Sequence, residues 1–173
     1  ATMGLTLAAW RAGKNPATAP AVMSTAVAAS AMRRSTSGSL NMSLPGTATI
    51  PAVSAARARA AEATGRRAVE LAVEGLAPRQ ILTTEAFDNA ITLLAAVGGG
   101  TNAVVHLLAL AGRVGVPLTL DRFGEVASQT PLLVNVRPSG EHLVEQLHHA
   151  GGVPVVLKEL APLLNGDALT VTG

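Results

Sequence analysis

A glycine run followed by polar side chains interrupts the apolar segment 94–115, LAAVGGGTNAVVHLLALAGRVG. Thr101 and Asn102 directly follow the three glycines, and His106 comes four residues after Asn102. Free N–H groups at the start of a helix can bind an anion, so a phosphate cradle is one interpretation. However, the segment lacks the GK[ST] of a Walker loop and a GxGxxG after a strand. We therefore favour a tight turn between two helices, in which glycines adopt positive φ.

His106 lies on the same helix face as Asn102, and Arg113 lies close to that stripe. Most lone histidines in apolar helices are core or boundary residues with hydrogen-bond partners, which favours a structural role for His106 over a chemical one. No carboxylate stands at metal-ligand spacing with the remaining histidines, which fall on an expected surface helix: His142, His148 and His149.

The chain of 173 residues contains no cysteine. This excludes disulfides, thiolate zinc sites, a cysteine nucleophile and cysteine-ligated iron–sulfur clusters within these residues. The length suits one domain, and a core made mainly of Ala, Val and Leu favours helices. No apolar run is long and clean enough to span a bilayer, and no signal-peptide core opens the sequence, so we expect a cytoplasmic protein without membrane contact.

Charge is distributed unevenly, because residues 1–61 contain no Asp or Glu while residues 62–173 contain all eleven acids. A basic, acid-free beginning could be a nucleic-acid arm or a transit peptide. It could also be an edge whose acidic partners lie elsewhere. We favour the last interpretation and expect no nucleic-acid partner, because such binding normally adds aromatic residues or a denser basic cluster.

Caps and apolar periodicity predict a mostly helical chain. Ser54 should begin a helix that ends at Gly75, Thr83 or Thr84 one that runs to about Val97, and Asp121 a short one. The remaining expected helices are 3–12, 21–34, 101–113, the segment from Ser139 to just before Gly151, and a short helix in 153–166. Residues 132–136 resemble a β-strand, and 167–173 should be extended. Together these elements predict an α/β fold with a small parallel sheet flanked by helices.

Three stretches carry a resemblance to a known family: NMSLPGTATIPAV, the long run from ILTTEAFDNAITLLAAVGGGTN to VNVRPSG, and HHAGGVPVVLKELAPLLNGDALTVTG. They resemble the dihydroxy-acid dehydratase and phosphogluconate dehydratase family, and within it the arabinonate, xylonate and galactonate type. The resemblance covers residues 42–173 and, more faintly, MSTA at 23–26. It implies that 42–173 are a piece of the α/β N-terminal domain, preceded by a basic segment 1–41 that matches poorly.

Membership would imply a lyase that removes water from a 2,3-dihydroxy or sugar acid to give a 2-keto acid. The family uses an iron–sulfur cluster as Lewis acid, a magnesium ion and a serine alkoxide base. The residues that the resemblance places near the substrate pocket are Thr25, Ser43, Thr101, Asn102 and His106.

The resemblance assigns no catalytic or metal-binding residue to this chain. A cluster cysteine of the family falls at Pro20, and the GGSTN of the family reads GGGTN, with Gly100 replacing the serine. The other cluster cysteines and the Asp-Lys magnesium pair lie upstream in the family, and the catalytic serine and a metal-binding glutamate lie downstream.

We therefore expect no cofactor in this chain, although the intact family carries an iron–sulfur cluster and Mg²⁺. A partner is expected, either the remainder of the enzyme or a second copy, besides a small hydroxy acid bound by the intact enzyme. The alternative is a non-catalytic, truncated descendant that acts as a structural or interaction module.

Overall fold

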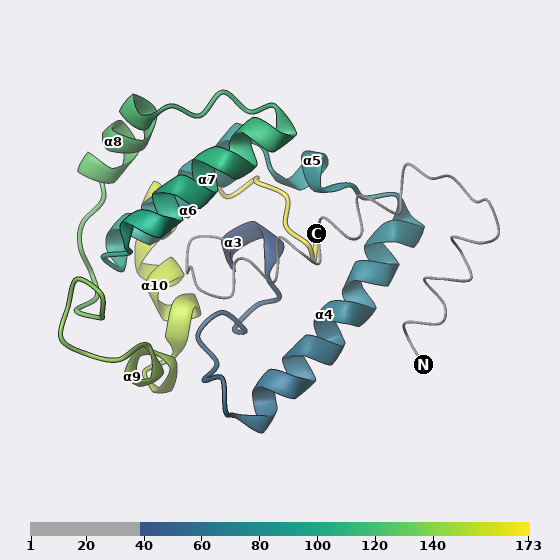
Figure 1. The fold of residues 1–173 in the computed structure, drawn as a ribbon, viewed down its shortest axis with the longest axis horizontal. Coiled ribbons are helices and arrows are strands. Elements are labelled where there is room, and N and C mark those ends of the chain that lie inside the picture. The colour runs from purple at the N-terminus through teal and green to yellow at the C-terminus, as the bar shows by residue number, and fades with distance from the viewer. Residues whose placement is uncertain (1–38) are drawn as a thin grey trace.

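A computed structural model describes residues 39–173, and its elements are helices joined by loops (Figure 1). In chain order they are α3 (Ser39–Met42), α4 (Ala55–Glu74), α5 (Pro78–Ile81), α6 (Thr84–Ala96), α7 (Thr101–Val114), α8 (Leu120–Ser128), α9 (Val144–His149), α10 (Gly152–Leu160) and a 3₁₀ turn, η3 (Ala161–Leu163). The prediction of a mostly helical chain is confirmed. The helices predicted at 3–12 and 21–34 lie outside the described residues.

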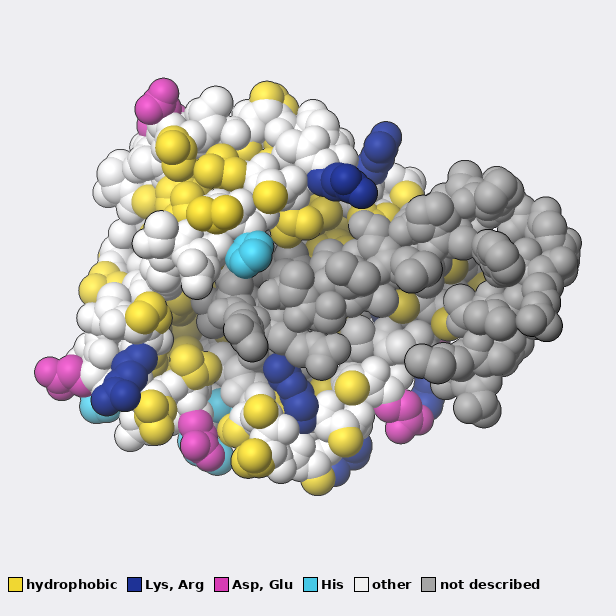
Figure 2. Space-filling view, in the orientation of Figure 1, with side chains coloured by type: hydrophobic (Ala, Val, Ile, Leu, Met, Phe, Trp, Pro, Cys, Tyr) yellow, Lys and Arg dark blue, Asp and Glu magenta, His cyan; other side chains and the backbone are white. Residues whose placement is uncertain are grey.

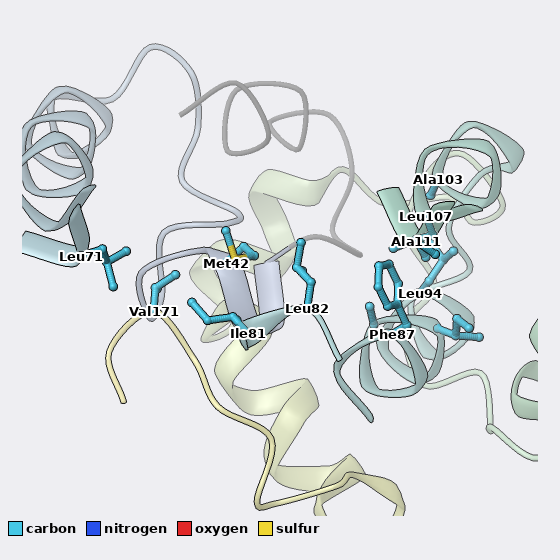
Figure 3. Close-up of a cluster of buried hydrophobic side chains, with 12 residues drawn as sticks. Met42, Leu71, Ile81, Leu82, Phe87, Leu94, Ala103, Leu107, Ala111 and Val171 are labelled. Atoms are coloured by element: carbon cyan, nitrogen blue, oxygen red, sulfur yellow. The ribbon is translucent and has the colours of Figure 1, made fainter. Parts of the chain in front are cut away.

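Helix α6 is the centre of the packing, because it buries residues on two opposite sides. Phe87, Ile91 and Leu94 lie in a cluster with the inner face of α7, whereas Leu93 and Ala96 lie in a second cluster with α10. In Figure 3 the first cluster extends from the side chains of α6 and α7 at one end to a second group of buried side chains at the other: Met42, Ile81, Leu82, Leu71 and Val171. A wide apolar face is expected on a helix that packs on two sides, although α6 also buries the polar residues Asn89 and Thr92.

The predicted ends of the longer helices are confirmed where local side-chain chemistry sets them. The Ser54 hydroxyl accepts a hydrogen bond from the N–H of Ala56, and Gly75 ends α4 with φ of 73°. The Thr83 hydroxyl accepts from the N–H of Ala86 at the start of α6. These N-caps satisfy backbone donors that the helix itself leaves unpaired, and glycine adopts the left-handed C-cap without strain.

Two predicted helix starts are wrong. Helix α8 is capped by Thr119, which accepts from the N–H of Arg122, and Asp121 lies inside the first turn. Helix α9 begins at Val144 after Leu143, not at Ser139, because residues 135–142 form a compact turn instead. In that turn the N–H of Arg137 donates to the oxygen of His142 at 2.8 Å. The short predicted helix after Gly151 is confirmed as α10.

The predicted sheet is not confirmed within residues 39–173, where the β-type pairing found is one isolated parallel bridge between Val136 and His142. The backbone of residues 132–136 bonds the end of α6 instead of a neighbouring strand: the N–H groups of Leu133 and Val134 donate to the oxygen of Ala96, at 2.8 and 3.2 Å. Near the C-terminus, the N–H of Val171 donates to the oxygen of Asn41. None of the helices in this part of the chain is long and apolar enough to cross a membrane.

Candidate functional site

The glycine turn joins α6 to α7 as the sequence predicts. Gly98 has φ of 62°, and the N–H of Gly99 closes the end of α6 on the oxygen of Leu94 at 2.9 Å. Gly100 then occupies the N-cap of α7 in extended conformation and offers no side-chain cap to the first turn. The positive φ is one that residues other than glycine adopt at a cost, which accounts for the glycine at 98.

The 131–142 loop holds this turn in place. The Ser139 hydroxyl donates to the oxygen of Gly98 at 2.5 Å. A Cβ built on Gly98 would collide with the Ser139 hydroxyl, and one on Gly100 would come within 3.3 Å of the Pro138 ring. The turn is therefore closely packed on one side, and α7 begins directly after it.

Thr101, Asn102 and His106 all lie exposed on α7, while Ala103, Leu107 and Ala111 form its buried face. His106, which we interpreted as a core or boundary residue with a structural role, is exposed at the surface. Hydroxyl, amide and imidazole groups that are free to reach solvent are also free to reach a polar ligand.

The remaining candidates lie elsewhere. Ser43 follows α3 and is half-buried. Among the described residues, no hydrogen bond or ion pair joins its side chain to Thr101, Asn102 or His106. Thr25 and Pro20 lie outside residues 39–173. The structure therefore brings three of the five predicted pocket residues onto one helix, whereas Ser43 comes from the end of α3, whose Met42 shares a buried cluster with Ala103 and Leu107 of α7.

Sequence reasoning missed two polar contacts between segments far apart in the chain. Asn89 is buried, and its amide bonds both backbone groups of Asn165, donating at 3.0 Å and accepting at 2.7 Å. The buried Thr49 hydroxyl lies 3.1 Å from Nδ1 of His148 on α9. Both pairs join residues more than seventy positions apart, so no local pattern could have identified them.

Charged side chains are scattered over the face of the described residues seen in Figure 2 rather than gathered in one patch. Among these residues one ion pair joins two helices, and the others lie within a single helix. Arg122 on α8 bonds Asp88 on α6 at 2.6 Å and Glu125 at 3.2 Å, and these two contacts raise the pKa of the guanidinium. The Thr83 hydroxyl at the start of α6 lowers the pKa of the Glu85 carboxyl. Neither arrangement is the desolvated, shifted acid or base that a catalytic proton transfer needs.

The donor set of this chain does not fit an iron–sulfur cluster, because the 173 residues supply no thiolate. Residues 39–173 also contain no group of three or more His, Asp or Glu side chains that could surround a metal ion. The closest approach of this kind is a pair, with Nε2 of His149 3.9 Å from Glu145. No step of a reaction is therefore assigned to a metal held by these residues.

Comparison with known proteins gives one consistent result. The family described as dihydroxy-acid/6-phosphogluconate dehydratase N-terminal matches residues 16–173. A dihydroxy-acid dehydratase of Sulfurisphaera tokodaii and an L-arabinonate dehydratase of Rhizobium leguminosarum bv. trifolii are each 52% identical over 136 residues, 78% of this chain and 24% of the relative. A dihydroxy-acid dehydratase of Mycobacterium ulcerans is 50% identical over 136 residues, with the same coverage.

This chain therefore spans about a quarter of the length of the curated relatives that it matches. The matched range covers α3 to the C-terminus and includes the glycine turn and the exposed face of α7. A match over most of the chain, together with half-identical relatives, is specific: the chain belongs to the dihydroxy-acid/6-phosphogluconate dehydratase N-terminal family.

Proposed function

We propose that this chain supplies part of the substrate-binding wall of a hydro-lyase that converts a 2,3-dihydroxy or sugar acid into a 2-keto acid. The observation that carries the proposal is the family match over residues 16–173. The half-identical relatives with dehydratase names support it. The reaction breaks the bond between C3 and its hydroxyl and removes the proton from C2. The resulting enol then becomes the 2-keto acid, with no net oxidation.

We assign binding roles, not the bond-breaking step, to this chain. The Asn102 amide and the Thr101 hydroxyl project from the first turn of α7, where they can hydrogen-bond the hydroxyls of a polyol acid. The positive end of the α7 dipole favours a carboxylate at the same place. His106 lies one turn further along and can donate or accept a hydrogen bond.

The 173 residues alone should not catalyse the reaction. Pro20 has no donor atom for a cluster, and no other residue supplies a thiolate. We expect no keto acid from arabinonate, xylonate or galactonate after anaerobic reconstitution with iron and sulfide. Pro20→Cys should not change that result, since one ligand cannot hold a cluster. Turnover that an iron chelator abolishes would contradict this expectation.

A graft tests the binding role directly. Residues 42–173 would replace the matching segment of the L-arabinonate dehydratase of R. leguminosarum, and keto acid formed from a panel of sugar acids and 2,3-dihydroxy acids would be measured. We expect activity, and the preferred acid reports the substrate branch. A folded, cluster-loaded chimera that converts no acid would overturn the proposal.

Within the graft, Asn102→Ala should raise KM more than it lowers kcat, by about tenfold for one lost hydrogen bond to a bound ligand. Gln129→Ala is the matched control, because Gln129 is also an exposed amide but follows α8. Equal effects of the two substitutions on KM would remove Asn102 from the pocket.

The absence of cysteine favours a second candidate, a non-catalytic descendant that acts as a structural or interaction module. The two candidates differ in what the native polypeptide contains. Iron and acid-labile sulfide in a longer native protein would support the enzyme, whereas a metal-free product of 173 residues would support the module.

A further inference from the structure

An asparagine is followed by a glycine once in this sequence, at Asn165 and Gly166, in the loop after η3. The backbone nitrogen of the following residue can attack the side-chain amide carbon of an asparagine and release ammonia. Glycine obstructs this attack least, because it has no side chain and the widest backbone freedom. The other asparagines all precede a residue with a side chain: Asn15, Asn41, Asn89, Asn102 and Asn135.

The surroundings of Gly166 leave its nitrogen open to reaction. Asn165 and Gly166 are both exposed, and they lie in a turn in which the N–H of Ala168 donates to the oxygen of Asn165 at 3.3 Å. A Cβ built on Gly166 would meet nothing within 4 Å. Within residues 39–173, no backbone oxygen accepts a hydrogen bond from the Gly166 N–H. An exposed turn of this kind opens more easily than a helix does.

Asn89 on α6 holds Asn165 from the protein side of the turn. The buried Asn89 amide donates to the Asn165 oxygen at 3.0 Å and accepts from the Asn165 N–H at 2.7 Å. The Asn165 side-chain nitrogen also donates to Oδ1 of Asn89, at 3.3 Å. The attack by the Gly166 nitrogen needs a rotation of the Asn165 side chain and backbone, and these three bonds oppose it.

We propose that Asn165 is a site of spontaneous deamidation in the folded chain and that its bonds with Asn89 limit the rate. The Gly166 nitrogen forms a bond to the side-chain amide carbon of Asn165 and loses its proton. The bond from that carbon to the amide nitrogen breaks, and ammonia leaves with the proton. Water then opens the cyclic imide at either carbonyl, which gives aspartate or isoaspartate. The reaction needs only water, and it uses no residue of α7, so it does not depend on the dehydratase proposal.

The isoaspartate product should loosen the C-terminal segment. In isoaspartate the main chain runs through the former side chain of Asn165, and the carbonyl that accepts from Asn89 becomes a free carboxylate. Residues 166–173 are then displaced from their attachment to α6. One contact that depends on their position is the bond from the Val171 N–H to the oxygen of Asn41, at 2.9 Å.

Ageing of the full chain at mildly alkaline pH tests the site, with proteolysis and mass spectrometry to measure conversion at each asparagine. Asn165 should convert first, and faster as the pH rises, because the attacking nitrogen must lose a proton. Enzymatic methylation of isoaspartate identifies that product. Asn102 is the control within the chain, since it is also exposed but precedes alanine. Equal conversion of Asn165 and Asn102 overturns the proposal.

Gly166→Ala isolates the attacking residue. The added Cβ meets open space and the φ of Gly166 is not positive, so the variant should fold as the wild type does. Its methyl group hinders the attack, and conversion of Asn165 should fall to the rate of the other asparagines. Conversion at the wild-type rate would exclude the cyclic imide and contradict the proposed reaction.

Asn89→Ala tests the control of the rate. It should accelerate conversion of Asn165 by about tenfold or more, because each lost hydrogen bond shifts the opening equilibrium several-fold. Gly98→Ala is the control for a general loss of stability, since it leaves the contact between Asn89 and Asn165 in place. Equal acceleration in the two variants would contradict control by Asn89. In the wild type, unfolding in urea should also accelerate conversion, and an unchanged rate would contradict protection by the fold.

Hydrogen exchange measures the consequence for the C-terminal segment. The aged chain carries an additional carboxylate, so ion-exchange chromatography separates it from the unmodified chain. The Val171 N–H should exchange faster in the aged fraction, whereas the amides of α7 should exchange as before. Equal exchange at Val171 in the two fractions would show that the modification leaves the segment in place and would overturn the proposed loosening.

Discussion

Replacement of Gly98 by alanine should lower the free energy of unfolding, because two separate effects act at this position. An alanine held at φ of 62° costs about 1 to 2 kcal/mol relative to glycine. Its Cβ would also displace the Ser139 hydroxyl, whose hydrogen bond to the oxygen of Gly98 is worth about 1 kcal/mol. We therefore expect Gly98→Ala to lower the free energy of unfolding by about 2 to 3 kcal/mol.

Urea unfolding followed by circular dichroism at a single protein concentration measures this change, because association would make stability depend on concentration. Ser139→Ala isolates the hydrogen bond and should cost about 1 kcal/mol. Gly112→Ala is the matched control. Gly112 lies on exposed, regular helix with open space around it, so alanine there should stabilise the chain by up to about 1 kcal/mol.

The test compares the changes in the free energy of unfolding caused by Gly98→Ala and Gly112→Ala, which should have opposite signs. If Gly98→Ala is as stable as the wild type, the left-handed turn and its closure by Ser139 are not what holds α7. If both alanine variants destabilise equally, the effect is a general loss of glycine and the argument from φ fails.

Two further substitutions test contacts that the sequence did not reveal. Asn89→Ala should lower the free energy of unfolding by about 2 to 3 kcal/mol, measured by urea unfolding, because it removes both bonds to the Asn165 backbone and leaves a small cavity. Arg67→Met should raise the pKa of Glu74, read by NMR titration of the carboxyl, because hydrogen bonding from Arg67 holds that pKa below its usual 4.5. The stabilising effect of this pair is present above pH 4.5 and should disappear as the pH falls through the lowered pKa; a flat acid-unfolding profile in the wild type, or an unchanged Glu74 pKa in the variant, would contradict this.

Helix ends were predictable where one side chain caps its own helix. Ser54 and Thr83 each accept a hydrogen bond from an N–H two or three residues later in the chain. Gly75 ends its helix in the left-handed conformation that glycine adopts without strain. At the start of α8, Thr119 and Asp121 are both good caps only two residues apart. Thr119 takes the cap, which leaves Asp121 in the first turn, where its charge favours the helix dipole.

Predictions failed where distant groups compete for the same backbone or side chain. Ser139 is a residue type favoured at N-caps, but its hydroxyl donates to the oxygen of Gly98, forty-one residues earlier. The run 132–136 has β-type composition, but a strand needs a neighbouring strand, and Ala96 at the end of α6 takes two of its N–H groups. Periodicity reports neither contact, because it depends on residues close in sequence.

The exposed position of Asn102 and His106 follows from how α6 and α7 divide the core between them. Helix α6 is buried on two sides and fills the centre, so α7 can bury only one face against it, that of Ala103, Leu107 and Ala111. The left-handed Gly98 reverses the chain tightly enough for that face to meet α6. Every polar residue at the start of α7 must then point outward. An apolar segment broken by glycines thus produces a closely packed helix start with hydrogen-bonding groups at the surface, the arrangement that the proposed substrate-binding wall needs.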